Sequence, residues 1–192
     1  MHTKLNFCFK GNRAYVQGPD IVAALLKHFS SAKLTDLDLK FNGITSTNLD
    51  LIDGDSADNA KVNIRVSLNG EQKIMQLVEN GTPVECRYDY DEDKVIAACE
   101  LDSQNQQIHL VQNTGYTLCE NFVAMNKYLL QQLFPDEQGK WYFTRLEQKY
   151  ILPDDALITV KLIKNFSFRL TKSDFLLNGE VVGSVYFTMV RS

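Results

Sequence analysis

The sequence lacks the marks of nucleic-acid-binding and membrane-spanning proteins. It has 20 lysines and arginines against 24 aspartates and glutamates, a net charge of −4, and no basic block. A general nucleic-acid partner is therefore disfavoured. No apolar run reaches the roughly 18 residues that a membrane span needs. Residues 1–10 lack the apolar stretch of a signal peptide. We therefore expect a cytoplasmic protein with no membrane span.

Cysteine and histidine are scarce and scattered. The four cysteines are Cys8, Cys86, Cys99 and Cys119, none of them in a C-x-x-C pair, and there are only three histidines. No metal site is expected from this spacing, and no cofactor. Three of the cysteines lie in apolar or strand-like runs, so we predict buried free thiols.

The remaining composition is ordinary for a globular protein. Apolar residues make up 44% and charged residues 23% of the 192 residues. This length suits one large domain or two small ones that share a core.

One long helix stands out over residues 114–134. Its apolar residues recur at a spacing of three and four, and Pro135 ends the run. The opposite side is also largely apolar, so we expect the helix to be buried on more than one side. Asn113 or Thr114 is expected to cap its first N–H groups. A sheet wrapped around this helix is the simplest arrangement.

Most of the other segments predict strands. A shorter helix is expected from Pro19 to Phe29, and Asn80-Gly81 and Asn178-Gly179 are typical hairpin turns. The acidic run 89–93 is interpreted as a solvated turn. Strands are predicted at 5–16 (as a strand or hairpin), 34–44, 62–68, 74–78, 84–90, 95–101, 108–111, 141–151, 157–163, 166–177 and 181–190.

The two halves show signs of a repeat. The segments before the two helices, the strands that start near Ile64 and Val160, and the two Asn-Gly turns match at offsets of 95 to 98 residues. A repeat of this size indicates a duplicated domain. We predict an N-terminal repeat over 1–92, expected to be degenerate, and a C-terminal repeat over 93–192.

A helix followed by hairpin-linked strands, present twice, resembles the double-hotdog arrangement. The resemblance implies an α+β fold of two tandem hotdog repeats, each a long central helix wrapped by a curved antiparallel β-sheet. It also implies a role in handling acyl thioesters, with acyl-CoA or acyl carrier protein as the partner.

Two closer resemblances lie in the second half. The run Gly115–Glu120 is similar to the start of the central helix of β-hydroxyacyl-carrier-protein dehydratases. Their glutamate works with a histidine in the preceding loop, whereas the histidine here, His109, lies six residues before Gly115 in a predicted strand. The stretch Asn113–Lys127 resembles the FcoT-like long-chain acyl-CoA thioesterases, which rely on polar side chains and water.

These patterns define a candidate site. Thioester hydrolysis needs a polarised carbonyl and an aimed water, which helix N-terminal N–H groups and a nearby carboxylate or amide supply. The candidate catalytic residues are Glu120, Asn113 and Gly115. The candidate substrate-binding residues are Thr114, Tyr116, Asp20 and Asn126. The competing interpretations are structural: capping for Asn113, Thr114 and Asp20, a partly exposed helix position for Glu120, and a core hydrogen bond for Asn126.

Three functions remain open from the sequence. The leading hypothesis is hydrolysis of an acyl-CoA or acyl-carrier-protein thioester. The second is a dehydratase or isomerase acting on β-hydroxyacyl thioesters. The third is a non-catalytic acyl-binding or scaffolding module. Pairing of the chain into a homodimer is left open.

Overall fold

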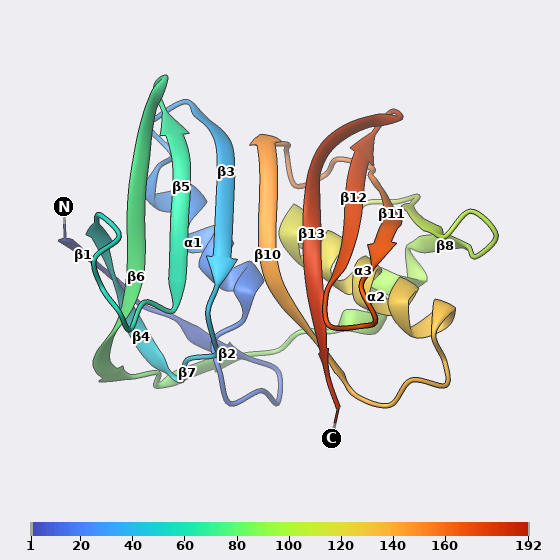
Figure 1. Ribbon diagram of the computed structural model, residues 1–192, viewed down its shortest axis with the longest axis horizontal. Helices are drawn as coiled ribbons and strands as arrows, with labels where there is room; N and C mark the ends of the chain where they lie inside the picture. The colour runs from blue at the N-terminus through green and yellow to red at the C-terminus, as the bar shows by residue number, and fades with distance from the viewer. Residues whose placement is uncertain (1, 192) are drawn as a thin grey trace. The chain divides into compact units, whose positions relative to one another are not determined.

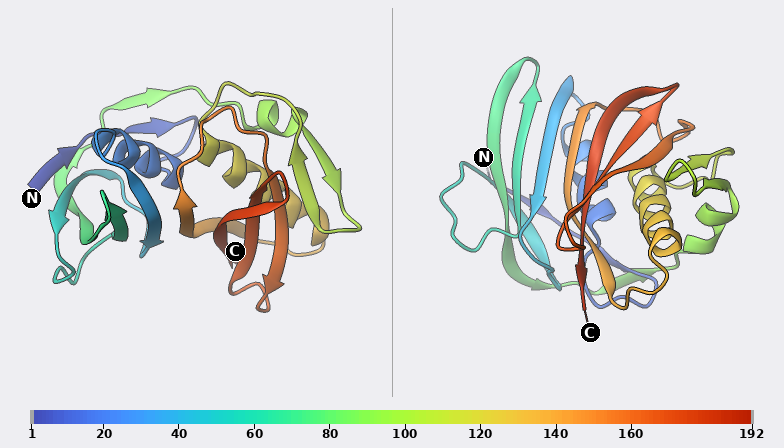
Figure 2. Two further views of the ribbon diagram at one scale, coloured as in Figure 1. Left: turned by 90° about the horizontal axis from the view of Figure 1, so that it is seen from above. Right: turned by 45° about the vertical axis from the view of Figure 1, so that its right-hand side comes forward.

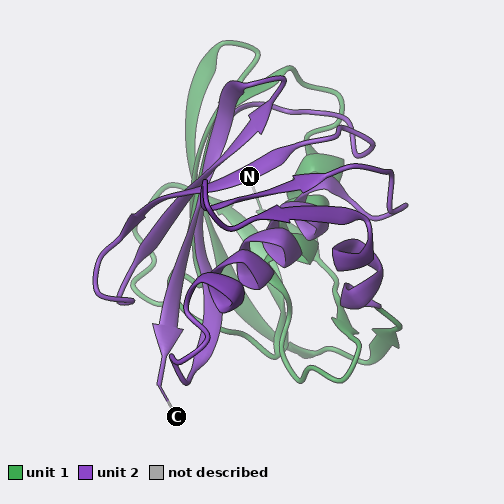
Figure 3. Cartoon of the chain, turned by 90° about the vertical axis from the view of Figure 1, so that its right-hand side faces the viewer, with its two compact units in different colours: residues 1–90 green, residues 91–192 purple. Residues whose placement is uncertain are grey.

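Two compact units make up the chain, residues 1–90 (unit 1) and residues 91–192 (unit 2), and Figure 3 colours them separately. The structure, a computed structural model, describes residues 2–191. Each unit combines helix with antiparallel sheet (Figure 1), as the α+β prediction requires. Within residues 2–191, no helix is long and apolar enough to cross a membrane.

Unit 1 consists of one main helix and a five-stranded antiparallel sheet of order β1-β4-β6-β5-β3. The helix lies against one face of the sheet (Figures 1 and 2) and buries Ile21, Val22 and Leu25. Its elements are β1 (His2–Leu5), α1 (Gly18–His28), β3 (Leu34–Phe41), β4 (Thr47–Asp53), β5 (Val62–Leu68) and β6 (Glu71–Pro83).

A disulfide in unit 1 contradicts the prediction that all four cysteines are free. Cys8 in β2 (Cys8–Lys10) is bonded to Cys86 in β7 (Cys86–Tyr88), and these two strands pair in parallel. Only the fold brings the two cysteines together, because they are 78 residues apart in sequence. Cys99 and Cys119 form no disulfide among residues 2–191, as predicted; Cys119 is buried and Cys99 is half-buried.

Unit 2 places a longer helix against a six-stranded antiparallel sheet of order β10-β13-β12-β11-β9-β8. The strands curve around this helix (Figure 2). Its elements are α2 (Glu92–Ala97), β8 (Cys99–Asp102), β9 (Gln107–Leu110), α3 (Leu118–Leu133), β10 (Lys140–Tyr150), β11 (Thr159–Asn165), β12 (Thr171–Leu177) and β13 (Glu180–Val190).

Aromatic contacts fix α3 on its sheet at both ends. The Phe122 ring, near the start of α3, stacks on Phe175 of β12 with 4.8 Å between centroids. Phe134, directly after the helix, meets Phe168 edge-on at 5.0 Å, just before β12. The predicted burial of this helix is confirmed, since ten of its residues are buried.

Several sequence predictions of secondary structure were wrong. Residues 92–97 form a helix rather than a turn and the start of a strand, because the Asp91 side chain caps the N–H groups of Asp93 and Lys94. Asn80-Gly81 lies inside β6 and forms no hairpin turn, whereas the turn expected at Asn69-Gly70 does join β5 to β6. Strand β4 was missed, because its polar residues Asn48 and Asp50 are buried and hide the alternation of a half-exposed strand.

The sequence offsets do not mark equivalent strands in the two units. In unit 2 the strand after the first connection, β11, pairs with β9 and β12. In unit 1 the corresponding strand, β4, pairs with β1 and β6, and β5 pairs with β3 and β6. The last two strands have therefore exchanged places in the sheet order, so the match of Ile64 with Val160 joins non-equivalent strands.

Gly183 in β13 tests the packing beneath α3. A Cβ at this position would lie 2.2 Å from the Glu147 carbonyl oxygen and 2.3 Å from the Phe175 ring. We expect Gly183→Ala to lower the free energy of unfolding by about 3 kcal/mol or more, because neither neighbour can move without disturbing the sheet. Gly43→Ala is the control, since nothing lies within 4 Å of its Cβ. Equal stability of the two variants in urea denaturation would contradict this packing.

Asp50 in unit 1 predicts a loss of stability in acid. Asn80 donates to its Oδ1 at 2.8 Å and His2 lies 2.6 Å from its Oδ2. The bond from Asn80, more than the contacts with His2, lowers the pKa of the Asp50 carboxyl below 3.8. Because the folded pKa is the lower one, this stabilisation is present above pH 4 and is lost as pH falls through the folded pKa.

The measurement is urea denaturation between pH 6 and pH 2.5. Asp50→Asn should show a shallower loss of stability below about pH 4 than the wild type. Replacing the exposed Asp55 by Asn should leave the wild-type curve unchanged. Parallel curves for wild type and Asp50→Asn would show that this carboxylate is not linked to folding.

Candidate functional site

The turn before α3 bonds to itself. Asn113 Oδ1 accepts from the Gly115 N–H at 2.8 Å, and Thr114 Oγ1 accepts from the Tyr116 N–H at 3.1 Å. Gly115 has a φ of +78°, which favours glycine. The Thr114 hydroxyl donates to Asn121 Oδ1 at 2.7 Å in the interior. Asn113 and Thr114 therefore shape the turn. The prediction that one of them caps α3 was wrong.

Thr117 and Glu120 form the actual cap. Thr117 Oγ1 accepts from the Glu120 N–H at 3.3 Å, and Glu120 Oε2 accepts from the Thr117 N–H at 2.9 Å and the Thr117 hydroxyl at 2.8 Å. This reciprocal capping box starts the helix at Leu118 rather than at residue 114. Glu120 is buried, not partly exposed, with 8% of its surface accessible.

The backbone donors at the start of α3 are largely used within unit 2. The Leu118 N–H donates to Asp154 Oδ1 at 2.8 Å, and the Asn121 N–H donates to the Thr117 carbonyl at 3.0 Å. With the four bonds of the turn and the cap, these contacts occupy the N–H groups that sequence reasoning had assigned to a carbonyl substrate. Asp154 was missed because an aspartate after a proline is typical of a turn, and only the fold brings it to α3.

Asn126 presents the opposite situation. It has no accessible surface, and neither Nδ2 nor Oδ1 has a hydrogen-bond partner. The core hydrogen bond that was the competing interpretation of Asn126 is absent. An amide left unpaired in an apolar interior costs several kcal/mol, so Asn126 is the clearest candidate in unit 2 for a side chain that binds a ligand.

Ser173 of β12 is a second buried polar group of this kind. Its Oγ has no partner and the residue has no accessible surface. Phe122 and Phe175 are in contact. Asn126 lies about 6 Å further along the helix, and Ser173 lies about 7 Å back along the strand. Both steps lead from the Phe122–Phe175 contact toward the Phe134–Phe168 contact.

Tyr116 connects the turn to α2. Its hydroxyl accepts from the Asp91 N–H at 3.3 Å, and Lys94 Nζ lies 5.1 Å from the centre of its ring. The helices α2 and α3 are also joined directly, by an ion pair of 2.7 Å between Glu92 and Lys127. Tyr116 and Lys94 thus lie beside Gly115, where a Cβ would be 3.9 Å from Lys94 Nζ.

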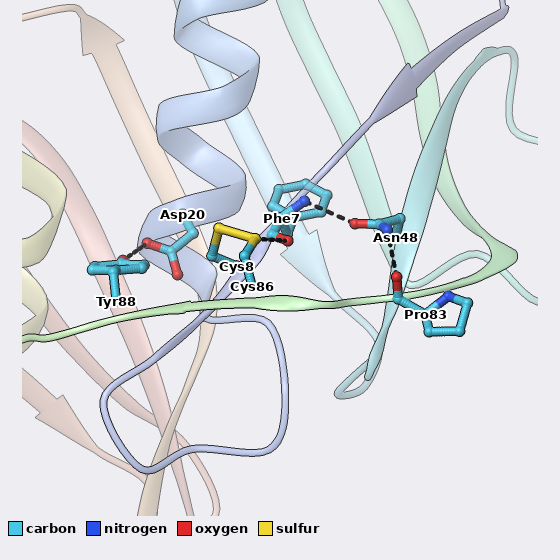
Figure 4. The surroundings of a disulfide bond; sticks show 7 residues. All are labelled: Phe7, Cys8, Asp20, Asn48, Pro83, Cys86 and Tyr88. Atoms are coloured by element: carbon cyan, nitrogen blue, oxygen red, sulfur yellow. Dashed lines mark hydrogen bonds between the residues drawn. A yellow bond between two sulfur atoms is a disulfide. The ribbon is translucent and has the colours of Figure 1, made fainter.

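Asp20 belongs to a separate cluster in unit 1. It lies in the first turn of α1 but does not cap it, since the N-cap residue is Gln17 and no side chain makes the cap bond. The Tyr88 hydroxyl donates to Asp20 Oδ1 at 2.5 Å (Figure 4), and Lys10 Nζ lies 3.3 Å from the same oxygen.

Other reactive groups are accounted for by local contacts. His109 Nδ1 lies 2.9 Å from Thr159 Oγ1 across β9 and β11, as expected for a structural histidine. Burial raises the pKa of the Cys99 thiol to about 11, which keeps it protonated near neutral pH. Among residues 2–191, no group of three or more His, Cys, Asp or Glu side chains is arranged to hold a metal ion.

Solved structures give the fold a name. The chain is similar to a candidate thioesterase from Novosphingobium aromaticivorans, with 9% identity over 100% of this chain and 94% of that chain and a TM-score of 0.52. It is similar to the dehydratase domain of PpsC from Mycobacterium tuberculosis, solved in complex with C12:1-CoA, with 8% identity over 98% and 92% and a TM-score of 0.52. A conserved protein of unknown function with a hot dog fold from Alicyclobacillus acidocaldarius matches with 10% identity over 100% and 93% and a TM-score of 0.50. The chain has the hotdog fold.

The predicted resemblance to hotdog thioesterases and dehydratases is confirmed at the level of the fold. No protein-family model matches the sequence, and no curated protein matches it. At such low identity the hotdog fold carries no residue roles with it, so those of unit 2 are argued from its own contacts.

The unpaired amide of Asn126 predicts an unusual response to mutation. Asn126→Leu should raise the free energy of unfolding by about 1 to 2 kcal/mol, because it removes a buried polar group that has no partner. Asn121→Leu is the matched control on the same helix. The Nδ2 of Asn121 also has no partner, but its Oδ1 accepts from the buried Thr114 hydroxyl. Asn121→Leu should lower stability, because it leaves that hydroxyl without its acceptor.

The check is urea denaturation followed by the fluorescence of Trp141, the only tryptophan. If both variants are destabilised alike, the Asn126 amide has partners in the folded protein and the argument for a ligand at this position fails.

Proposed function

We propose that this protein hydrolyses an acyl thioester in unit 2, with acyl-CoA or an acyl carrier protein as the substrate. The observation that carries the proposal is the buried, unpaired amide of Asn126 inside a hotdog fold. Asn126 Nδ2 would donate to the thioester carbonyl oxygen, where negative charge develops in the transition state. Side-chain amides serve this purpose in water-excluded sites.

Glu120 is proposed as the group that takes the proton from the attacking water. It is the carboxylate of α3 in the predicted stretch, and its Oε2 is held by Thr117 at 2.9 and 2.8 Å. Such contacts fix the orientation of a general base. Water adds to the carbonyl carbon as Glu120 takes its proton, the carbon–sulfur bond breaks, and the departing thiolate takes the proton back from Glu120. The products are the thiol and the carboxylic acid.

The remaining predicted residues take supporting positions in this proposal. Asn113, Thr114 and Gly115 form the turn from which α3 starts. The Tyr116 ring makes a cation–π contact with Lys94. Lys94 Nζ beside Gly115 offers a positive charge to the phosphates of coenzyme A or of a carrier's phosphopantetheine. Ser173 would bind the acyl group next to the carbonyl.

The finer architecture belongs to the same proposal. Each unit is one hotdog repeat, and unit 2 is the working half. Unit 1 has a helix of 11 residues against 16 in α3. Its exchanged strand order and shorter helix are consistent with a degenerate repeat. In this account, Asp20 holds a structural cluster rather than substrate.

A non-catalytic acyl-binding module is the second candidate. The observation that favours it is the engagement of Glu120 in the capping box, which a purely structural glutamate would also make. Such a module would use Asn126 and Ser173 to bind an acyl group without turnover.

The test separates the cap from the chemistry. Glutamine at the third helical position also completes a capping box. Glu120→Gln should therefore change the free energy of unfolding by less than about 0.5 kcal/mol. We expect it to lower kcat for acyl-CoA hydrolysis by about 100-fold, which is the typical contribution of a general base. Glu120→Ala should lose activity together with about 1 kcal/mol of stability.

The assay follows loss of the thioester absorbance with acyl-CoA and acyl-carrier-protein substrates of several chain lengths. Full activity in Glu120→Gln would remove Glu120 from the mechanism. Absence of turnover, with an acyl ligand retained in native mass spectrometry, would establish the binding module instead. Hydration of an enoyl thioester would indicate dehydratase chemistry.

A further inference from the structure

The segment that leaves unit 1 for unit 2 is exposed over most of its length. After β6 ends at Pro83, the chain forms the three-residue strand β7 and reaches α2 at Glu92. Strand β7 pairs in parallel with β2 over only three residues, and all three of its own residues are exposed. A pair of this length is marginal without a further tie.

The Cys8–Cys86 disulfide is that tie, and it lies at one end of the pair (Figure 4). Cys86 is exposed while Cys8 is half-buried. Beside it, Arg87 donates to the carbonyl oxygens of Gly11 and Arg13. Exposed hydrogen bonds of this kind open readily once the backbone is free to move.

A cluster of polar and aromatic side chains is built on the same pair. Lys10, which lies opposite Tyr88, is buried with Nζ 4.4 Å from the centre of the Tyr90 ring and 5.6 Å from that of Tyr88. Lys10 and Tyr88 both contact Asp20 in the first turn of α1. The position of Asp20 therefore depends on two strands that the disulfide joins.

The chain before this pair is anchored independently of the disulfide. Asn48 of β4 accepts from the Phe7 N–H at 2.8 Å and donates to the Pro83 carbonyl at 2.9 Å (Figure 4). Asn48 is itself buried. Breaking the disulfide would thus leave both strands pinned at their starting points and release only the residues that follow Pro83.

We propose that the Cys8–Cys86 disulfide is a redox-controlled clamp on the connector between the two units, and that Lys10 and Tyr88 transmit its state to Asp20. In the oxidised state the connector is fixed through Tyr88, so residues 89–91 alone span the interval to α2. In the reduced state residues 84–90 are released, while Asp91 stays bound as the cap of α2. The clamp does not rest on the proposed hydrolysis of thioesters.

The reductant is a dithiol. One of its thiolates attacks the sulfur of Cys86, the bond between the two protein sulfurs breaks, and Cys8 leaves as a thiolate that takes up a proton. The second thiol of the reductant then displaces Cys86, and the reductant becomes a cyclic disulfide. The protein gains two electrons and two protons.

The experiment compares the full chain before and after dithiothreitol. Readouts are amide hydrogen exchange and limited cleavage by trypsin after Arg87. We expect reduction to speed cleavage at Arg87 by at least tenfold and to raise exchange in residues 84–90 and in the first turn of α1. Exchange in β4 and β5 should not change, because the anchor at Asn48 remains.

Matched variants separate the clamp from general effects of the reductant. Without any reductant, the Cys8→Ser/Cys86→Ser double variant should resemble the reduced wild type. Cys99→Ser should keep the full response to dithiothreitol. Tyr88→Phe, with the disulfide intact, should raise exchange in the first turn of α1 but leave cleavage at Arg87 slow.

Two outcomes would overturn the proposal. Equal cleavage and exchange in the two redox states would show that the disulfide does not restrain the connector. Increased exchange throughout β3 to β6 on reduction would show that it is a staple of the whole unit. The wild-type comparison decides between these results even if the double variant does not fold.

Discussion

The burial of α3 against the sheet of unit 2 is the constraint on which the rest of that unit depends. Phe122 packs on Phe175 of β12, and Phe134 packs on Phe168 just before β12, so both ends of the helix are held. A helix enclosed in this way must satisfy its polar groups internally, and its first turn does so through Thr117, Glu120 and Asp154. Asn126 differs from the other polar residues of α3 because neither atom of its buried amide has a partner, and the functional proposal rests on this residue.

The same constraint changes the proposed chemistry of the site. Helix N-terminal N–H groups are a common oxyanion site, and the glycine at position 115 favoured that use here. The structure instead commits the Leu118 N–H to Asp154 and the Glu120 N–H to Thr117. The donor role therefore passes from the backbone at the start of α3 to a side-chain amide two turns further along.

Periodicity predicted the elements whose packing is one-sided or complete. The alternation of Val62–Leu68 and the apolar body of α3 identified a strand and the central helix. Periodicity did not predict β4, because two of its polar residues are buried. Asn48 binds Phe7 and Pro83, and Asp50 binds His2 and Asn80. Contacts between residues far apart in sequence leave no local pattern. For this reason the sequence predicted neither the roles of Asp154 and Ser173 nor the Cys8–Cys86 disulfide.

Glu120 and Asn126 were identified from the sequence, but their environments were not. The Thr-x-x-Glu pattern at 117–120 is a local signal for a capping box, and it predicts a helix that starts at Leu118. The unpaired state of Asn126 depends on what the sheet presents to α3, and no spacing along the chain encodes that.

The most direct measurement is a structure of the protein with an acyl-CoA analogue in which a methylene ketone replaces the thioester. The account predicts the ketone oxygen within about 2.7 to 3.2 Å of Asn126 Nδ2, with the acyl chain passing Ser173. An analogue bound elsewhere, with Asn126 still enclosed by protein atoms, would contradict it.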